Sequence, residues 1–164
     1  MKRIRHRLEY WGVATTVLMA RLLPWRAVRA LGTALGYAFY AFDARHRRVA
    51  LVNVGAAFPR KTAGQHRRMV RHVFGHFGRL LFELLKFSGL RPDEMLRRVE
   101  VEGREHSDNA LRLGRGVLYF TGHFGYWEIH AIAHGASHAS IGVLARPLDN
   151  PYLHRLLEDM RSCT

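Results

Sequence analysis

The chain has 164 residues, enough for one modest domain with a hydrophobic core, and its 48% hydrophobic content argues against disorder. Basic side chains outnumber acidic ones by 26 to 13, which leaves a net charge of +13. A GC-rich gene would also enrich arginine, but it would not explain the excess of bases over acids. The composition therefore predicts anionic partners: a lipid surface, an acidic protein or nucleic acid.

Cysteine chemistry is limited to one residue, Cys163. A single cysteine excludes an internal disulfide and any metal site built on paired cysteines.

The first 42 residues form a basic and apolar segment. Residues 1–9 are basic, and the apolar runs 10–25 and 27–42 follow, each compatible with a helix and separated at Pro24. Arginines interrupt both runs, so neither reaches the roughly 18–20 clean apolar residues of a transmembrane helix. The start also resembles a signal peptide, but it lacks a convincing cleavage site. We expect residues 1–42 to lie in a membrane interface, with arginines reaching lipid phosphates. Two buried helices of a soluble domain are the alternative.

Residues 43–97 are expected to be a helical scaffold. Residues 45–57 read as a short helix. Thr62 and Gln65 form a capping-box pattern, and apolar residues then recur at helical spacing to about residue 88. This pattern predicts one long amphipathic helix.

The pattern changes near residue 98, where short apolar segments alternate with helical ones. The expected strands are 99–103, 116–123 and 139–146, and the expected helices are 104–115, 125–135 and 150–161, the last capped by Asn150 or Asp149. This alternation predicts an α/β fold for residues 98–164, with a mainly parallel βαβ sheet. In such sheets the chemistry gathers at the carboxyl ends of the strands.

The motif "YFTGHFGYWE" (119–128) carries the first candidate site. His123 would leave a strand, and Gly122 and Gly125 permit a tight turn that brings Glu128 beneath it. Glu128 would accept a proton from one imidazole nitrogen, leaving the other nitrogen to act as a general base. A metal site is the rival interpretation. At about 100° per residue, however, the helix turns Glu128 away from the later histidines, and no H-E-x-x-H pattern is present. The third interpretation is an ordinary corner between a strand and a helix, with no catalytic or metal-binding role.

Arg146, in "ARPLDNP", follows the next expected strand. There it would face the same crevice as His123 and Glu128 and could bind phosphate or stabilise negative charge. The alternative is a structural pair between Arg146 and Asp149.

Together these segments resemble a known family. "GVLYFTGHFGYWE", "RPLDNPYLHRLLEDMR" and the earlier "RRVALVNVGAAFP" and "FGRLLFELLK" are similar to the late acyltransferases of lipid A biosynthesis, the lauroyl/myristoyl transferases. The chain departs from the family pattern at Tyr126, where asparagine is usual. Family members also continue well beyond residue 164, so the α/β core is expected to be incomplete at its C-terminus.

The resemblance implies an enzyme on the cytoplasmic face of the bacterial inner membrane. It would transfer a fatty acyl group from acyl-carrier protein to a hydroxyl of a lipid A precursor. His123 would be the base, Glu128 its orienting carboxylate and Arg146 a phosphate or charge-binding residue, with no metal or organic cofactor. Three alternatives stay open: acylation of another glycolipid such as a phosphatidylinositol mannoside, an inactive truncated remnant that binds membranes or anions, and a nucleic-acid binder. Only the charge supports the last.

Overall fold

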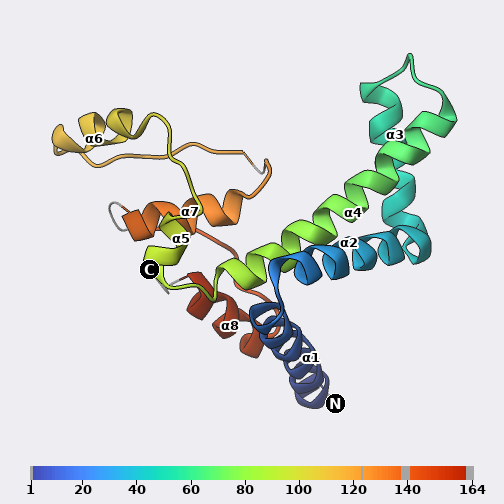
Figure 1. The fold of residues 1–164 in the computed structure, drawn as a ribbon, viewed down its shortest axis with the longest axis horizontal. Helices are drawn as coiled ribbons and strands as arrows, with labels where there is room; N and C mark the ends of the chain where they lie inside the picture. Colours follow the sequence, from blue (N-terminus) through green and yellow to red (C-terminus); the bar gives the residue numbers. More distant parts are fainter. Residues whose placement is uncertain (1, 123, 138–140, 162–164) are drawn as a thin grey trace. The chain divides into compact units, whose positions relative to one another are not determined.

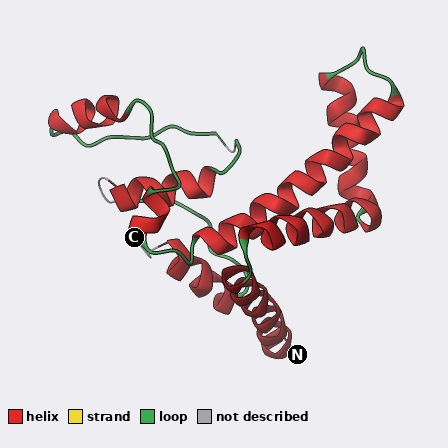
Figure 2. Cartoon of the chain, viewed as in Figure 1, coloured by secondary structure: helices red, strands yellow, loops and turns green. Residues whose placement is uncertain are grey.

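The computed structural model describes residues 2–122, 124–137 and 141–161, and all regular secondary structure in these ranges is helical (Figures 1 and 2). The helices in chain order are α1 (Lys2–Leu22), α2 (Trp25–Phe42), α3 (Ala44–Ala57), α4 (Ala63–Phe87), α5 (Pro92–Leu96), α6 (Arg104–Arg112), α7 (Trp127–Ser137) and α8 (Pro151–Arg161).

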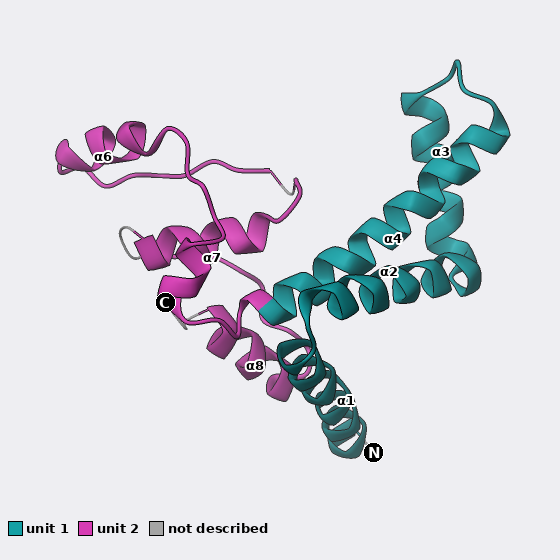
Figure 3. Ribbon diagram, in the orientation of Figure 1, with its two compact units in different colours: residues 1–86 teal, residues 87–164 magenta. Residues whose placement is uncertain are grey.

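The chain divides into two compact units, Met1–Lys86 and Phe87–Thr164 (Figure 3). The first contains α1 to α4. The second contains α5 to α8, and within it α5 packs against α7. Its buried apolar residues include Met95, Ile132, Ala133 and Met160.

The helices expected from residue patterns are confirmed. Pro24 separates α1 from α2, because its fixed φ and missing N–H suit a helix start and not a helix interior. The capping box before α4 forms as predicted: the Thr62 N–H donates to Gln65 Oε1 at 2.8 Å, and the Gln65 N–H donates to Thr62 Oγ1 at 3.3 Å. At α8, Asn150 Oδ1 accepts the N–H groups of Tyr152 and Leu153.

The predicted parallel sheet is wrong. Among the described residues of 99–103, 116–123 and 139–146, none forms a strand, and the segments run as loops. Their apolar side chains are exposed, with Leu118 at 93%, Phe120 at 102% and Leu144 at 105%. The physical reason is that a strand exists only through pairing with a neighbour. A run of β-branched and aromatic residues favours extended backbone, but it does not supply the pairing strand.

The expected interfacial position of residues 1–42 stays a prediction. No helix in the described part of the chain is both long enough and apolar enough to cross a bilayer.

Helices α2 and α4 pack with their backbones in contact, side by side in Figure 1. A Cβ added at Gly36 would lie 2.1 Å from the Phe74 carbonyl oxygen, and one added at Gly78 would lie 2.2 Å from the Gly32 carbonyl oxygen. Only glycine permits this approach, since every other residue carries a Cβ. The crossing of α2 and α4 is therefore fixed by glycines on both helices.

The carboxyl-terminal end of α1 is held by Lys86, near the end of α4. Its ammonium donates to the carbonyl oxygens of Leu23 at 2.6 Å, Arg21 at 2.9 Å and Ala20 at 3.5 Å. It also lies 5.5 Å from the centre of the Trp25 ring. These carbonyls have no acceptor role left inside the helix, so the lysine satisfies them and complements the negative end of the helix dipole.

The glycine contact predicts that Gly36→Ala destabilises the chain. Alanine gains about 1 kcal/mol of helix propensity over glycine, but overpacking against rigid backbone costs about 1–3 kcal/mol. We expect a net loss in the free energy of unfolding, measured by urea denaturation followed by circular dichroism. Gly12→Ala in α1 is the matched control, because a Cβ there meets nothing within 4 Å. It should be neutral or stabilising, and equal losses in both variants would contradict the packing argument.

Candidate active site

The candidate site begins at the turn that leads into α7. Gly125 adopts a left-handed backbone with φ 57°, a conformation that favours glycine, and this supports the expected turn. Helix α7 starts at Trp127, so Glu128 stands in its first turn, where a carboxylate is favoured by the helix dipole. His123 lies outside the described residues. The His123–Glu128 pair therefore stays a prediction.

The structure gives Glu128 a partner that the sequence did not suggest. Arg161, in the last turn of α8, binds the carboxylate with two nitrogens: Nη2 lies 2.6 Å from Oε1, and Nε lies 3.2 Å from Oε2. The side chains are 25% and 33% exposed, for Glu128 and Arg161 respectively. A two-point contact of this kind fixes the orientation of the carboxylate as well as its charge.

The Arg161 contact leaves Glu128 with acceptor capacity. A carboxylate offers about four lone-pair positions, and Arg161 occupies one on each oxygen. A second donor, such as an imidazole N–H, can still bind. Arg161 thus fixes the position of the carboxylate and leaves a lone pair on each oxygen for a further hydrogen bond.

Sequence reasoning missed Arg161 because its partner lies 33 residues away. Each charge stands at the helix end that the dipole favours, an acid in the first turn of α7 and a base in the last turn of α8. The helix dipole therefore explains each residue separately. The sequence spacing does not predict that the two side chains bind each other.

Arg146 lies in the loop before α8 and is 88% exposed. Its Nη2 stands 3.8 Å from Asp149 Oδ1, which is the structural pair considered as the alternative. That distance is an ion pair without a hydrogen bond. No interaction connects Arg146 with Glu128 in the part of the chain that is described, so the expected role of Arg146 also stays a prediction.

Two histidines, His130 and His134, stand on α7, where a metal site was the rival interpretation. The His134 ring contacts Tyr119 edge-on, with ring centres 4.7 Å apart. Among residues 2–122, 124–137 and 141–161, no three His, Cys, Asp or Glu side chains are placed to hold one ion. What the described site offers is one oriented carboxylate.

Comparison with known proteins gives this geometry a context. The family model for bacterial lipid A biosynthesis acyltransferases matches residues 1–163. The chain is 31% identical over 150 residues to the lipid A biosynthesis lauroyltransferase of Escherichia coli, covering 91% of this chain and 48% of that protein. It is 28% identical over 121 residues to the lipid A biosynthesis palmitoleoyltransferase of the same organism, covering 73% of this chain and 39% of the relative.

The chain thus spans about half the length of the curated relatives it matches. No solved structure matches it. The match to the family model extends over nearly every residue, and on that ground the chain belongs to the bacterial lipid A biosynthesis acyltransferase family.

Proposed function

We propose that the protein transfers a fatty acyl group from acyl-carrier protein to a hydroxyl of a lipid A precursor, at the cytoplasmic face of the inner membrane. The observation that carries the proposal is the family match over residues 1–163, which includes the His123–Glu128 motif. Relatives named for lauroyl and palmitoleoyl transfer support the reaction class.

In the proposed reaction His123 removes the proton from the acceptor hydroxyl as its oxygen attacks the thioester carbonyl. The tetrahedral oxyanion then collapses, the carbon–sulfur bond breaks, and the thiolate takes the proton back from the imidazolium. Glu128 holds the imidazole and stabilises its charge. Arg161 keeps Glu128 in position, and we assign it the role of a positioning residue.

Arg146 is proposed to bind a phosphate of the acceptor or to stabilise developing negative charge. Its high exposure and weak pairing with Asp149 support this role, because little has to be broken before an anion binds. The proposed chemistry needs neither a metal nor an organic cofactor, since attack on a thioester requires only a base and charge stabilisation.

The surface of α1 supports a membrane interface. One side of this helix is buried through Val17 and Ala20, while the opposite side carries an exposed apolar stripe. The stripe consists of Ile4, Leu8, Trp11, Leu18 and Leu22, which are between 57% and 77% exposed. A helix with an apolar stripe in a strongly basic chain is suited to lie at an anionic lipid surface. The same basic charge suits an acidic carrier protein.

A second candidate function follows from this stripe alone. The 164-residue chain would bind anionic membranes without catalysing transfer. Activity and vesicle binding separate the two candidates, because a binding module would pass only the second test.

The assigned base predicts a large loss of activity in His123→Ala. General base catalysis contributes about 10²–10⁴-fold, so turnover by the complete gene product, with acyl-carrier protein thioester and a lipid A precursor, should fall within that range. Glu128→Gln should lower kcat by a smaller factor. Full turnover in His123→Ala would disprove the role of the histidine. Glu105→Gln in α6 serves as the control, because this carboxylate is 70% exposed and has no role in the proposed reaction.

The positioning role predicts different pH profiles for two variants of Arg161. Arg161→Gln removes a positive charge beside Glu128, which then stabilises the imidazolium more strongly. The acidic limb of kcat/KM should therefore move to higher pH. Arg161→Lys keeps the charge but loses the two-point contact, so its limb should stay in place while kcat falls. Identical profiles in wild type and both variants would reduce Arg161 to a structural residue.

The apolar stripe predicts vesicle binding that depends on Leu18 and Leu22. Burying a leucine side chain is worth about 1.5–3 kcal/mol. Flotation with phosphatidylglycerol-containing liposomes should thus weaken at least tenfold in the Leu18→Ser/Leu22→Ser double variant. Val52→Ser on α3, where the valine is 66% exposed, is the control. Equal binding by the double variant and wild type would exclude the stripe as the contact surface.

A further inference from the structure

A cavity of about 200 Å³ lies between α2 and α4. The cavity is open to solvent, and its volume is well above the roughly 10–15 Å³ that one water molecule needs on this measure. Its lining residues are Thr33, Tyr37, His72, Gly75, His76 and Arg79. Both helices belong to the unit Met1–Lys86, so the cavity is built within one unit.

Gly75 lines this cavity and lies against the Tyr37 ring. A Cβ at Gly75 would lie 2.6 Å from the Tyr37 ring, and the close backbone contact at Gly36 and Gly78 brings the two helices together just beside it. Thr33 and Tyr37 are four residues apart on α2, as are His72 and His76 on α4, so each pair shares a helix face. The two faces meet across the hollow.

The lining is polar, and each of its side chains can donate at least one hydrogen bond, apart from Gly75, which has none. Thr33 and Tyr37 carry hydroxyls, His72 and His76 carry imidazoles, and Arg79 carries a guanidinium. Among the residues that the structure describes, no carboxylate lines the cavity. A group of donors without an acidic side chain is suited to an anion with several oxygens.

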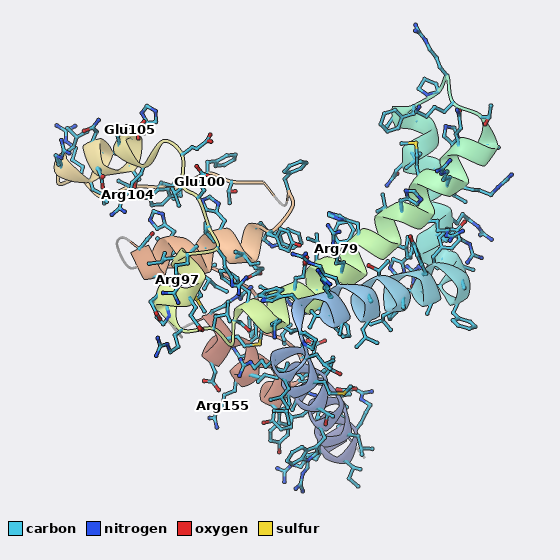
Figure 4. All side chains as sticks on the ribbon, in the orientation of Figure 1. Arg79, Arg97, Glu100, Arg104, Glu105 and Arg155 are labelled. Carbon is cyan, nitrogen blue, oxygen red and sulfur yellow. The ribbon has the colours of Figure 1, made fainter. Side chains whose placement is uncertain are left out.

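Arg79, labelled in Figure 4, shares its carboxylate partner with a second arginine. Its carboxylate partner, Glu83, has a side chain that is only 5% exposed, and it already accepts a hydrogen bond from Arg29 Nε at 2.5 Å. Arg79 Nε lies farther away, 3.6 Å from the second oxygen, and is buried without a hydrogen bond. Two guanidinium groups therefore share one carboxylate, and a net positive charge remains.

We propose that the cavity between α2 and α4 binds a phosphate group. Arg79 would supply the charge, His72 and His76 further donors, and the hydroxyls of Thr33 and Tyr37 the remaining hydrogen bonds. Phosphate offers several acceptor oxygens and matches this set, whereas a metal ion would find only two histidines. The proposal is independent of the acyl-transfer reaction, because the cavity contains none of the residues assigned to it.

The first experiment titrates the 164-residue chain with inorganic phosphate. Binding is followed through the imidazole NMR signals of His72 and His76 and by calorimetry, without any acyl donor. We expect saturable shifts of both histidines. The absence of any phosphate-dependent shift at these two rings would overturn the proposal, whatever the outcome of the activity assay.

Variants separate a built site from general attraction to a basic chain. Arg79→Gln should weaken phosphate binding at least tenfold, equivalent to about 1.4 kcal/mol. Because Arg79 also pairs with Glu83, the Tyr37→Phe/His72→Gln double variant provides a second test that leaves this ion pair intact. Arg67→Gln is the matched control, an exposed arginine of α4 outside the cavity lining. Equal weakening by Arg67→Gln would overturn the proposal.

A vesicle arm distinguishes the source of the phosphate. Phosphatidic acid presents a phosphate monoester, and phosphatidylglycerol presents a diester in the same membrane plane. If the site takes a lipid headgroup, wild type should prefer phosphatidic acid and Arg79→Gln should lose that preference. If inorganic phosphate binds but Arg79→Gln changes the binding to neither kind of vesicle, the site takes phosphate from solution.

Discussion

The contact that the N-terminal unit depends on is the backbone approach of α2 and α4 through Gly32, Gly36, Gly75 and Gly78. With no side chain at these positions, the two helices cross at a distance that no other residue type permits. The side chains of both helices therefore lie beside the crossing. On one side of it, polar side chains of α2 and α4 line the cavity described above. Glycine here determines where the polar groups of both helices can meet.

Two acidic side chains of low exposure, Glu83 and Glu128, are paired with arginine. Glu83, whose side chain is 5% exposed, lies between Arg29 and Arg79, and Glu128 is held by Arg161. Moving a carboxylate out of water costs free energy unless a cation and hydrogen bonds replace the solvent. The excess of arginine supplies such partners at both places. The two clusters differ in what remains open: at Glu83 a guanidinium charge is in excess, and at Glu128 the carboxylate retains acceptor capacity.

The sequence predicted the helices well and the sheet poorly, for a physical reason. Helix signals are local: Pro24 as a break, Thr62 with Gln65 as a cap and Asn150 as an N-cap each act within a few residues, and the structure confirms all three. A sheet requires pairing between distant segments, so Leu118, Phe120 and Leu144 suggested strands that the described chain does not form. The same limit applies to the site. Glu128 was found by its motif, but Arg161 is joined to it only by tertiary structure, and His123 lies outside the described residues.

The cation at the carboxyl-terminal end of α1 is a lysine and not an arginine, and the difference affects its hydrogen bonds. Only three of the 26 basic residues are lysines, and one of them, Lys86, donates to carbonyl oxygens around the last turn of that helix. An ammonium directs three hydrogens tetrahedrally and can satisfy acceptors arranged around a point, whereas a guanidinium directs its donors within a plane. Most cations of this chain are arginines, but the three carbonyl oxygens around residue 86 match the donor geometry of a lysine. Arginine at position 86 would keep the positive charge but would lose these contacts between α1 and α4.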